Sequence, residues 1–384
     1  MKILPETPSL DFLRREAKDL LAVLRENDAS VTLSDAQRTL AERYGFRSWT
    51  ELKAEVERRR AADASVDQQL GAELAEAFGL GTPVAPMSQL AWSQTGEDWK
   101  LQTDAGTWRV RTILDWITPQ MLEDAARLRE AAIARGMVAP VPVRSPGGSL
   151  VESVQGKRWC ADVWLDVGPE PVKPASEEVA RGVGRILGTL HSTALPATGP
   201  VNPWLTQRRT PDQWHRIADT VRASGAEWAT ALDDALVHIV DLTAIETPQT
   251  DEEPILCICD LSVRTCGDSL AVTHWDFSGS FLRSMELASV LSSWSVAPDG
   301  APDERAVRAL VDGYRSVSGY VPTLTLGSFV ADIAAWLNWT AGRISGALQG
   351  PDPEWRRREV LELRGLLARP RTRDHYLRIL AALA

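Results

Sequence analysis

The chain has 384 residues, 44% of them hydrophobic and 24% charged, which is the composition of a globular protein and excludes a disordered one. Its formal net charge of −10 argues against a nucleic-acid or membrane-surface partner, because such partners attract basic proteins. Four cysteines do not form a disulfide framework in a chain of this length, and the first residues lack the apolar run of a signal peptide, so we expect a reduced cytoplasmic protein.

The first 60 residues carry the spacing of a small helical unit. Apolar residues between Leu10 and Leu24 recur at helical intervals. Ser34 and Ser48 are each followed three residues later by Gln or Glu, a capping-box pattern that predicts the starts of two more helices. The alanine-rich stretch 61–65 is the expected linker to the rest of the chain.

This N-terminal unit resembles a helical module found at the front of several bacterial proteins. The resemblance rests on residues 13–21, 34–37 and 44–49. In those relatives the module precedes ankyrin repeats or small enzymatic domains, and it brings no chemistry that can be transferred. We therefore expect residues 1–62 to be an accessory domain, with residues 1–60 as a possible docking site for a protein partner.

A small β-rich region is expected from residue 66 onward. Two of its segments alternate apolar and polar residues around Asp104-Ala-Gly106, which is the signature of a β-hairpin. The expected elements are a helix at 67–78, strands at 99–103 and 108–112, a helix at 119–135, strands on both sides of 146–148, and a strand at 160–167.

The remainder is expected to be mostly helical, so a β-rich lobe precedes a larger helical lobe. The apolar stretch 329–339 is short and broken by Asp332, which argues against a membrane span. Cys257 and Cys259 lack the spacing and the partners of a zinc site, so we expect small buried cysteines. His191 shows no metal or triad pairing in the sequence and is expected at the surface or as a helix cap.

The order of these elements resembles the aminoglycoside phosphotransferase and choline kinase superfamily, a relative of protein kinases. The resemblance covers roughly residues 68–345 and implies an α+β, two-lobed protein-kinase-like fold, with the N-lobe at 66–166 and the C-lobe at 167–384. The matching segments are 96–101 (nucleotide-covering hairpin), 108–111 (strand with a basic end residue), 163–168 (connection between the lobes), 179–195 (first long helix) and 285–291 (helix after the metal-binding strand).

The resemblance also implies a nucleotide site with ATP as cofactor. Arg111 stands where the family places the cation that contacts the phosphates, and its acidic partner is Glu123 or Asp124. Gly96 belongs to the nucleotide-covering hairpin. Trp164 belongs to the segment that lines the adenine pocket.

The catalytic and metal positions carry a mixture of expected and unexpected residues. Phosphoryl transfer needs a carboxylate that orients the acceptor hydroxyl and hard oxygen ligands for Mg²⁺. Asp260 occupies the catalytic position, and Thr265 stands where an Asn normally binds the metal. His274 stands at the position of the usual metal-binding Asp, which makes it a poor host for magnesium. Asp276, two residues on, is the candidate that takes over this role.

Three functions are compatible with these residues. The first is an ATP-dependent O-phosphotransferase that acts on a small hydroxylated molecule with a reduced metal site. The second is a pseudokinase that binds a ligand or a partner enzyme without transferring phosphate. The third is a kinase-like site converted to other acid/base chemistry by Asp260, His274 and Asp276.

Overall fold

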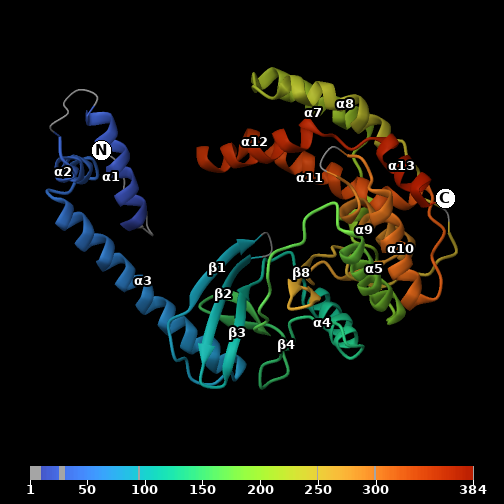
Figure 1. Ribbon diagram of the computed structural model, residues 1–384, viewed down its shortest axis with the longest axis horizontal. Helices are drawn as coiled ribbons and strands as arrows, with labels where there is room; N and C mark the ends of the chain where they lie inside the picture. The colour runs from blue at the N-terminus through green and yellow to red at the C-terminus, as the bar shows by residue number, and fades with distance from the viewer. Residues whose placement is uncertain (1–9, 26–30, 94–95, 249, 298–299, 384) are drawn as a thin grey trace. The chain divides into compact units, whose positions relative to one another are not determined.

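The computed structural model describes residues 10–25, 31–93, 96–248, 250–297 and 300–383. The chain divides into two compact units. The first unit consists of Met1–Leu114 and Val143–Trp164, and the second of Asp115–Pro142 and Leu165–Ala384. Figure 1 shows the helices and strands of each unit. The α+β class that the sequence predicted is confirmed by this content of helix and antiparallel sheet.

The chain begins with three helices, α1 (Leu10–Arg25), α2 (Leu33–Arg43) and α3 (Trp49–Phe78). They form their own core, with Leu13, Leu40 and Leu52 almost fully buried. Ser48 caps α3 as predicted, because its hydroxyl accepts a hydrogen bond from the Glu51 amide at 3.1 Å.

Two predictions in this region are wrong. The cap of α2 is Thr32, which forms a capping box with Asp35, and Ser34 is already inside the helix. Helix α3 runs without a break through 61–65, where the sequence predicted a linker. Alanine has the highest helix propensity and the stretch contains neither Gly nor Pro, so nothing in it interrupts the helix.

An antiparallel sheet dominates the rest of the first unit. Its strands are β1 (Ser88–Ser93), β2 (Gly96–Thr103), β3 (Gly106–Thr112), β4 (Pro142–Val143), β5 (Glu152–Val154) and β6 (Lys157–Val163), ordered β1-β2-β3-β6-β4 with β5 paired to β6. The predicted hairpin is confirmed, with Thr103 opposite Gly106 at its turn. The end of α3 covers the sheet through Leu74 and Phe78, which share a core with Leu101 and Val110.

The second unit is mainly helical. Its helices are α4 (Pro119–Ile133), α5 (Glu177–Ser192), α6 (Pro203–Thr206), α7 (Pro211–Ser224), α8 (Ala229–Thr243), α9 (Arg283–Trp294), α10 (Glu304–Ser318), the 3₁₀ helix η1 (Leu326–Phe329), α11 (Val330–Gln349), α12 (Pro353–Ala368) and α13 (Arg373–Leu383). Its four short strands are β7 (Ile255–Cys257), β8 (Val263–Cys266), β9 (Ser269–Val272) and β10 (Gly279–Phe281). They pair as two antiparallel ribbons, β7 with β10 and β8 with β9.

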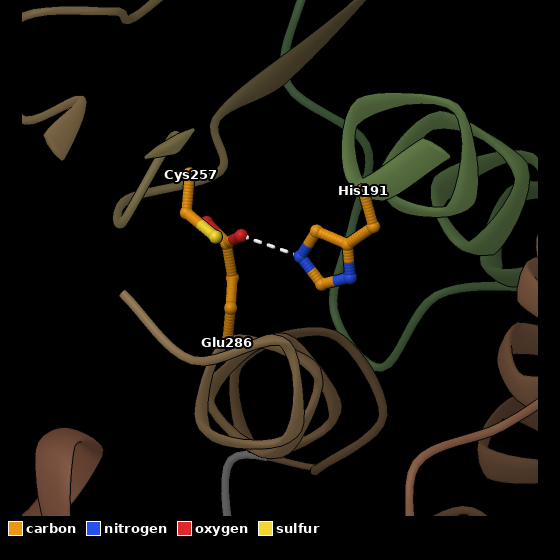
Figure 2. A group of neighbouring side chains, drawn as sticks. All are labelled: His191, Cys257 and Glu286. Carbon is orange, nitrogen blue, oxygen red and sulfur yellow. Dashed lines mark hydrogen bonds and ion pairs between the residues drawn. The ribbon is translucent and has the colours of Figure 1, made fainter. Parts of the chain in front are cut away.

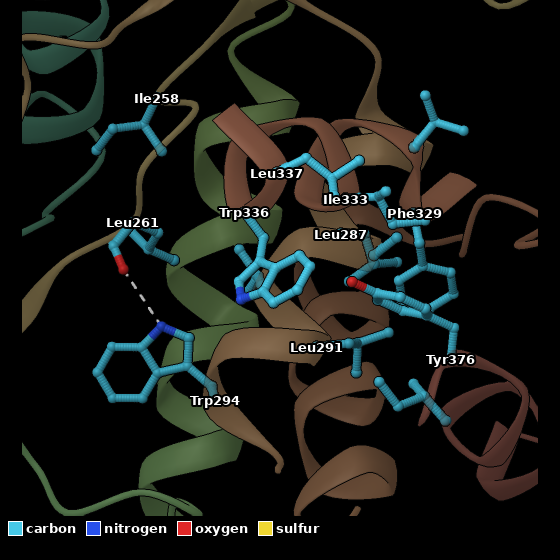
Figure 3. Close-up of a cluster of buried hydrophobic side chains, with 14 of the residues drawn as sticks. Ile258, Leu261, Leu287, Leu291, Trp294, Phe329, Ile333, Trp336, Leu337 and Tyr376 are labelled. Atoms are coloured by element: carbon cyan, nitrogen blue, oxygen red, sulfur yellow. Dashed lines mark hydrogen bonds between the residues drawn. The ribbon is translucent and has the colours of Figure 1, made fainter. Parts of the chain in front are cut away.

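Two close contacts lie in the core of the second unit. Helices α5 and α10 approach so closely that a Cβ on Gly184 would overlap the Leu310 carbonyl. Figure 3 shows part of the core of this unit, formed by residues of α9, α11, α13 and the segment after β7, in which the indole N–H of Trp294 donates to the Leu261 carbonyl at 3.2 Å. This bond ties the residue after Asp260 to α9.

Among the described residues, no helix combines the length and the apolar composition that crossing a bilayer requires.

Candidate active site

Asp260 is presented to solvent by a strained turn at the end of β7. The preceding residue, Cys259, has a φ of +63°, a left-handed conformation that is uncommon for a side chain other than Gly. Its backbone N–H donates to Oε1 of Glu286 at 2.6 Å, which holds the turn in place. The Asp260 side chain is 58% exposed, so an incoming molecule can reach its carboxylate.

A buried hydrogen-bond network supports this turn from inside the second unit. The second oxygen of Glu286 lies 2.7 Å from Nε2 of His191, and Nδ1 of His191 lies 2.8 Å from the Tyr314 hydroxyl. Figure 2 shows the contact between the imidazole and the carboxylate. Since a carboxylate only accepts, Nε2 carries the proton, and Nδ1 of a neutral ring accepts from Tyr314. Burial raises the pKa of the Tyr314 hydroxyl, so this donor keeps its proton.

The position of His191 corrects the sequence prediction. It was expected at the surface or as a cap, and it is 3% exposed in the core. Its partners lie 95 and 123 residues away in the chain, so no local pattern announced them.

Cys257 lies beside this network. Its sulfur and the ligand atoms of His191 and Glu286 are within 4.8 Å of one another, which is the donor set of a metal site (Figure 2). Burial raises the pKa of the Cys257 thiol well above its usual value, and the imidazole and carboxylate already bond to each other. We therefore interpret the group as a structural network. All four cysteines are free. Cys257 is buried as predicted, whereas Cys259 and Cys266 are only partly buried.

Asp260, His274 and Asp276 come together at one end of the β8–β9 hairpin. The ladder continues beyond the strands, since the Thr273 amide donates to the Ser262 carbonyl at 3.2 Å. This pairing puts His274 opposite the loop that carries Asp260. Nδ1 of His274 lies 3.2 Å from Oδ2 of Asp260, and Nε2 lies 3.8 Å from Oδ2 of Asp276.

The three side chains differ in exposure and charge. Asp276 is 3% exposed, whereas His274 is 31% exposed and Asp260 is the most accessible. When the His274 ring is protonated, it lies within ion-pair distance of both carboxylates. An edge-on contact from Phe277, at 5.4 Å between ring centroids, covers one side of the imidazole, and Trp116 stacks on Phe277 at 5.5 Å.

Thr265 lies at the other end of the same hairpin. It pairs with Leu270 near the turn, and its hydroxyl donates to the Pro169 carbonyl at 3.3 Å. Thr265 lies three residues after Ser262, which corresponds to about 10 Å along an extended strand. Strand β8 begins only three residues after Asp260, so Thr265, five residues after Asp260, lies inside the strand and not in the loop.

The first unit carries three of the residues assigned to the nucleotide. Arg111 is on β3 and 6% exposed, opposite Asp98 in β2 and Cys160 in β6. Gly96 begins β2 with a φ of +141°, where a Cβ would overlap the backbone of Thr112, so only Gly fits.

Trp164 follows β6, and its amide donates to the Thr107 carbonyl at 3.0 Å. The Lys100 ammonium lies 4.4 Å from the centroid of its ring, a cation–π contact.

Helix α4 of the second unit carries Glu123 and Asp124. The Asp124 carboxylate is occupied within that unit, because it accepts from Thr198 at 2.5 Å and from Arg127 at 3.1 Å. Glu123 is half-buried on the same helix. Its pairing with Arg111 stays a prediction.

Two family models match the chain. One, described as phosphotransferase enzyme family, matches residues 86–320, which is more than half of the chain and includes Asp260, His274 and Asp276. The other, described as glyoxalase superfamily protein, matches residues 4–81, the region of the N-terminal helices. This second match does not test the resemblance to the module that precedes ankyrin repeats.

Known proteins with a similar sequence or fold are small-molecule kinases. Homoserine kinase of Granulibacter bethesdensis is 25% identical over 256 residues, which cover 65% of this chain and 77% of that protein. The structure is similar to spectinomycin phosphotransferase in complex with ADP and spectinomycin (TM-score 0.57, 10% identity, 82% of this chain and 98% of that one). It is also similar to amicoumacin kinase in complex with AMP-PNP, Ca²⁺ and Ami (TM-score 0.52, 12% identity, 82% of this chain and 97% of that one).

Proposed function

The chain belongs to the phosphotransferase enzyme family, and from that premise we propose that it transfers a phosphoryl group from ATP to a hydroxyl of a small molecule in the cytoplasm. The observation that carries this proposal is the presentation of Asp260. Its exposed carboxylate stands on a turn that Glu286 fixes through the Cys259 amide. A positioned carboxylate is the group that this reaction requires of the protein, because phosphoryl transfer depends mainly on orientation and charge.

Each proposed residue has one role. Asp260 accepts a hydrogen bond from the acceptor hydroxyl and takes its proton as the hydroxyl oxygen bonds to the γ-phosphorus of ATP. The bond from that phosphorus to the β,γ-bridging oxygen breaks in the same step, and ADP leaves. Arg111 neutralises phosphate charge, and its planar guanidinium suits phosphate oxygens. Gly96 lets the backbone of β2 approach the nucleotide, and Trp164 offers a ring to the base. Glu123 is proposed as the partner that orients Arg111.

The divalent cation that this family implies requires a particular set of donor atoms. Mg²⁺ prefers oxygen ligands in near-octahedral geometry. Asp276 supplies a carboxylate, but His274 faces it with a nitrogen and Thr265 lies at the far end of β8. These residues do not fit the expected two-ligand magnesium site, and no step of the proposal depends on a metal.

The proposed acceptor is a small molecule that carries a hydroxyl and an amine. Homoserine has both groups, and the named substrates of the two similar structures are small molecules. In this chain His274 contacts both the exposed Asp260 carboxylate and the ring of Phe277, on which Trp116 stacks. A carboxylate beside aromatic rings favours a cationic ligand over an anionic one.

The test is ADP release in a coupled assay with a panel of amino alcohols, homoserine and aminoglycosides. We expect release that depends on one class of acceptor, and a loss of about 10²–10⁴-fold in kcat for Asp260→Asn with ATP affinity unchanged. Asp268→Asn is the matched control, because Asp268 is an exposed aspartate in the turn of the β8–β9 hairpin. Acceptor-dependent release that survives Asp260→Asn would refute the assigned role.

The second candidate is a protein that binds a nucleotide without transferring phosphate. The contact of His274 with both carboxylates favours it, because the imidazole engages the proposed base itself. Saturable ATP binding without ADP release for any acceptor is the result that this candidate predicts.

A further inference from the structure

His274 links the two acidic groups of the candidate active site. Its two ring nitrogens point in different directions, one toward Asp260 at 3.2 Å and the other toward Asp276 at 3.8 Å. The Nε2 side of the ring therefore lies beside Oδ2 of Asp276. Phe277 covers one edge of the ring and limits the rotamers that it can adopt.

A divalent cation at Asp276 needs the space that this ring fills. Mg²⁺ binds oxygen at about 2.0–2.1 Å and requires up to six ligands around it. Asp276 is 3% exposed, so the approaches to its carboxylate are restricted, and His274 takes the one toward Asp260. The hydroxyl of Thr265, which the family spacing offered as a second ligand, donates to Pro169 at the other end of β8.

We propose that this protein binds ATP without a divalent cation at Asp276, with the His274 side chain in the place that the cation would take. The inference rests on the proposed function in one respect, that ATP is the ligand. The inference concerns the dependence of ATP binding on metal, whereas the proposed function concerns the transfer of phosphate, so the two are measured separately. The chain offers a structural reason for such binding, since the imidazole and the buried carboxylate already contact each other.

The test is calorimetric ATP binding by the full chain, in excess EDTA and then in millimolar MgCl₂. For the unaltered protein we expect the two dissociation constants to agree within about twofold. His274→Ala opens the position, so its ATP affinity should rise about tenfold or more when Mg²⁺ is added. Mn²⁺ added with ATP should then give the EPR signal of a bound ion in His274→Ala only.

Controls separate the ring from general effects of substitution. His238→Ala removes an exposed histidine on α8 and should behave as the unaltered protein does. Adding Asp276→Asn to His274→Ala should abolish the gained Mg²⁺ dependence. If His274→Ala does not fold, as judged by circular dichroism, His274→Gln keeps a side chain of similar length and is expected to gain a smaller Mg²⁺ dependence.

The outcomes are distinct. ATP binding by the unaltered protein that tightens about tenfold with Mg²⁺, and loses that gain in Asp276→Asn, would overturn the inference while leaving the proposed function intact. Metal-free binding without phosphoryl transfer to any acceptor would support the inference and refute the proposed function. No ATP binding with or without Mg²⁺ would refute both.

Discussion

Glu286 is expected to be the most stability-critical polar residue near the candidate active site. It accepts two hydrogen bonds, from the Cys259 amide at 2.6 Å and from His191 at 2.7 Å, and it is 1% exposed. Bonds to a charged acceptor contribute about 1.5–3 kcal/mol each, and water cannot replace them at this depth. Glu286→Ala leaves both donors unsatisfied, so we expect a loss of about 3–5 kcal/mol in the free energy of unfolding.

Glu286→Gln separates the charge from the hydrogen bonds. The amide oxygen still accepts from Cys259, and the amide nitrogen donates to Nε2 of His191 once the ring proton moves to Nδ1. That ring N–H then donates to the Tyr314 oxygen, which is 2.8 Å away. The expected loss is therefore only about 1–2 kcal/mol.

The assay is scanning calorimetry of the full chain, combined with hydrogen exchange of residues 255–262. At about 2–4 °C per kcal/mol, Glu286→Ala should lower the melting temperature of the second unit by roughly 6–20 °C. Glu252→Ala is the control. Its carboxylate bonds to the Ser284 hydroxyl at 2.6 Å at the start of α9, in a half-buried position, and should cost about 1 kcal/mol. Equal losses for the two variants, or unchanged exchange at Cys259, would refute the reasoning.

Two further predictions concern the helical part of the second unit. Burial and the neighbouring Arg371 lower the pKa of His375 to about 4, so the folded state disfavours its protonation. Its contribution to the free energy of unfolding is complete above the unfolded pKa near 6.5 and is lost, by up to about 3 kcal/mol, as the pH falls toward 4. Urea unfolding measured across this pH range should therefore show a weaker pH dependence for His375→Gln than for the unaltered protein. Gly184→Ala should cost about 1–3 kcal/mol because the new methyl group overlaps the Leu310 carbonyl, whereas Gly342→Ala, with no neighbour within 4 Å, should gain about 0.5–1 kcal/mol. Shifts of the same sign in the two glycine variants would contradict this reading of the α5–α10 contact.

Much of the fold could be predicted because its signals are local. The hairpin around Asp104 and the cap at Ser48 each depend on a few consecutive residues. The cap of α2 was misplaced because Thr32 with Asp35 fits a capping box as well as Ser34 does, and the sequence cannot rank the two. The composition of 61–65 resembles a linker, but its alanines also favour a helix. The residues on both sides are helical, and α3 continues through the stretch.

The candidate active site could be predicted in part for the same reason. Asp260 lies three residues after the end of β7, and the short hairpin after it brings His274 to its side. Thr265 was predicted as a metal ligand from a spacing that assumes a longer loop after Asp260. Because β8 already begins at Val263, Thr265 lies in the strand. The support provided by Glu286, His191 and Tyr314 joins three distant helices, and a single sequence contains no signal that links them.

The central claim is that the Asp260 carboxylate serves a phosphoryl transfer. ³¹P NMR of the full chain, mixed with ATP and an amino alcohol acceptor, observes the reaction itself. With the unaltered protein, we expect a phosphomonoester signal to replace the γ-phosphate signal, whereas the γ-phosphate signal should persist with Asp260→Asn. A phosphomonoester signal that grows equally with both proteins would contradict this claim.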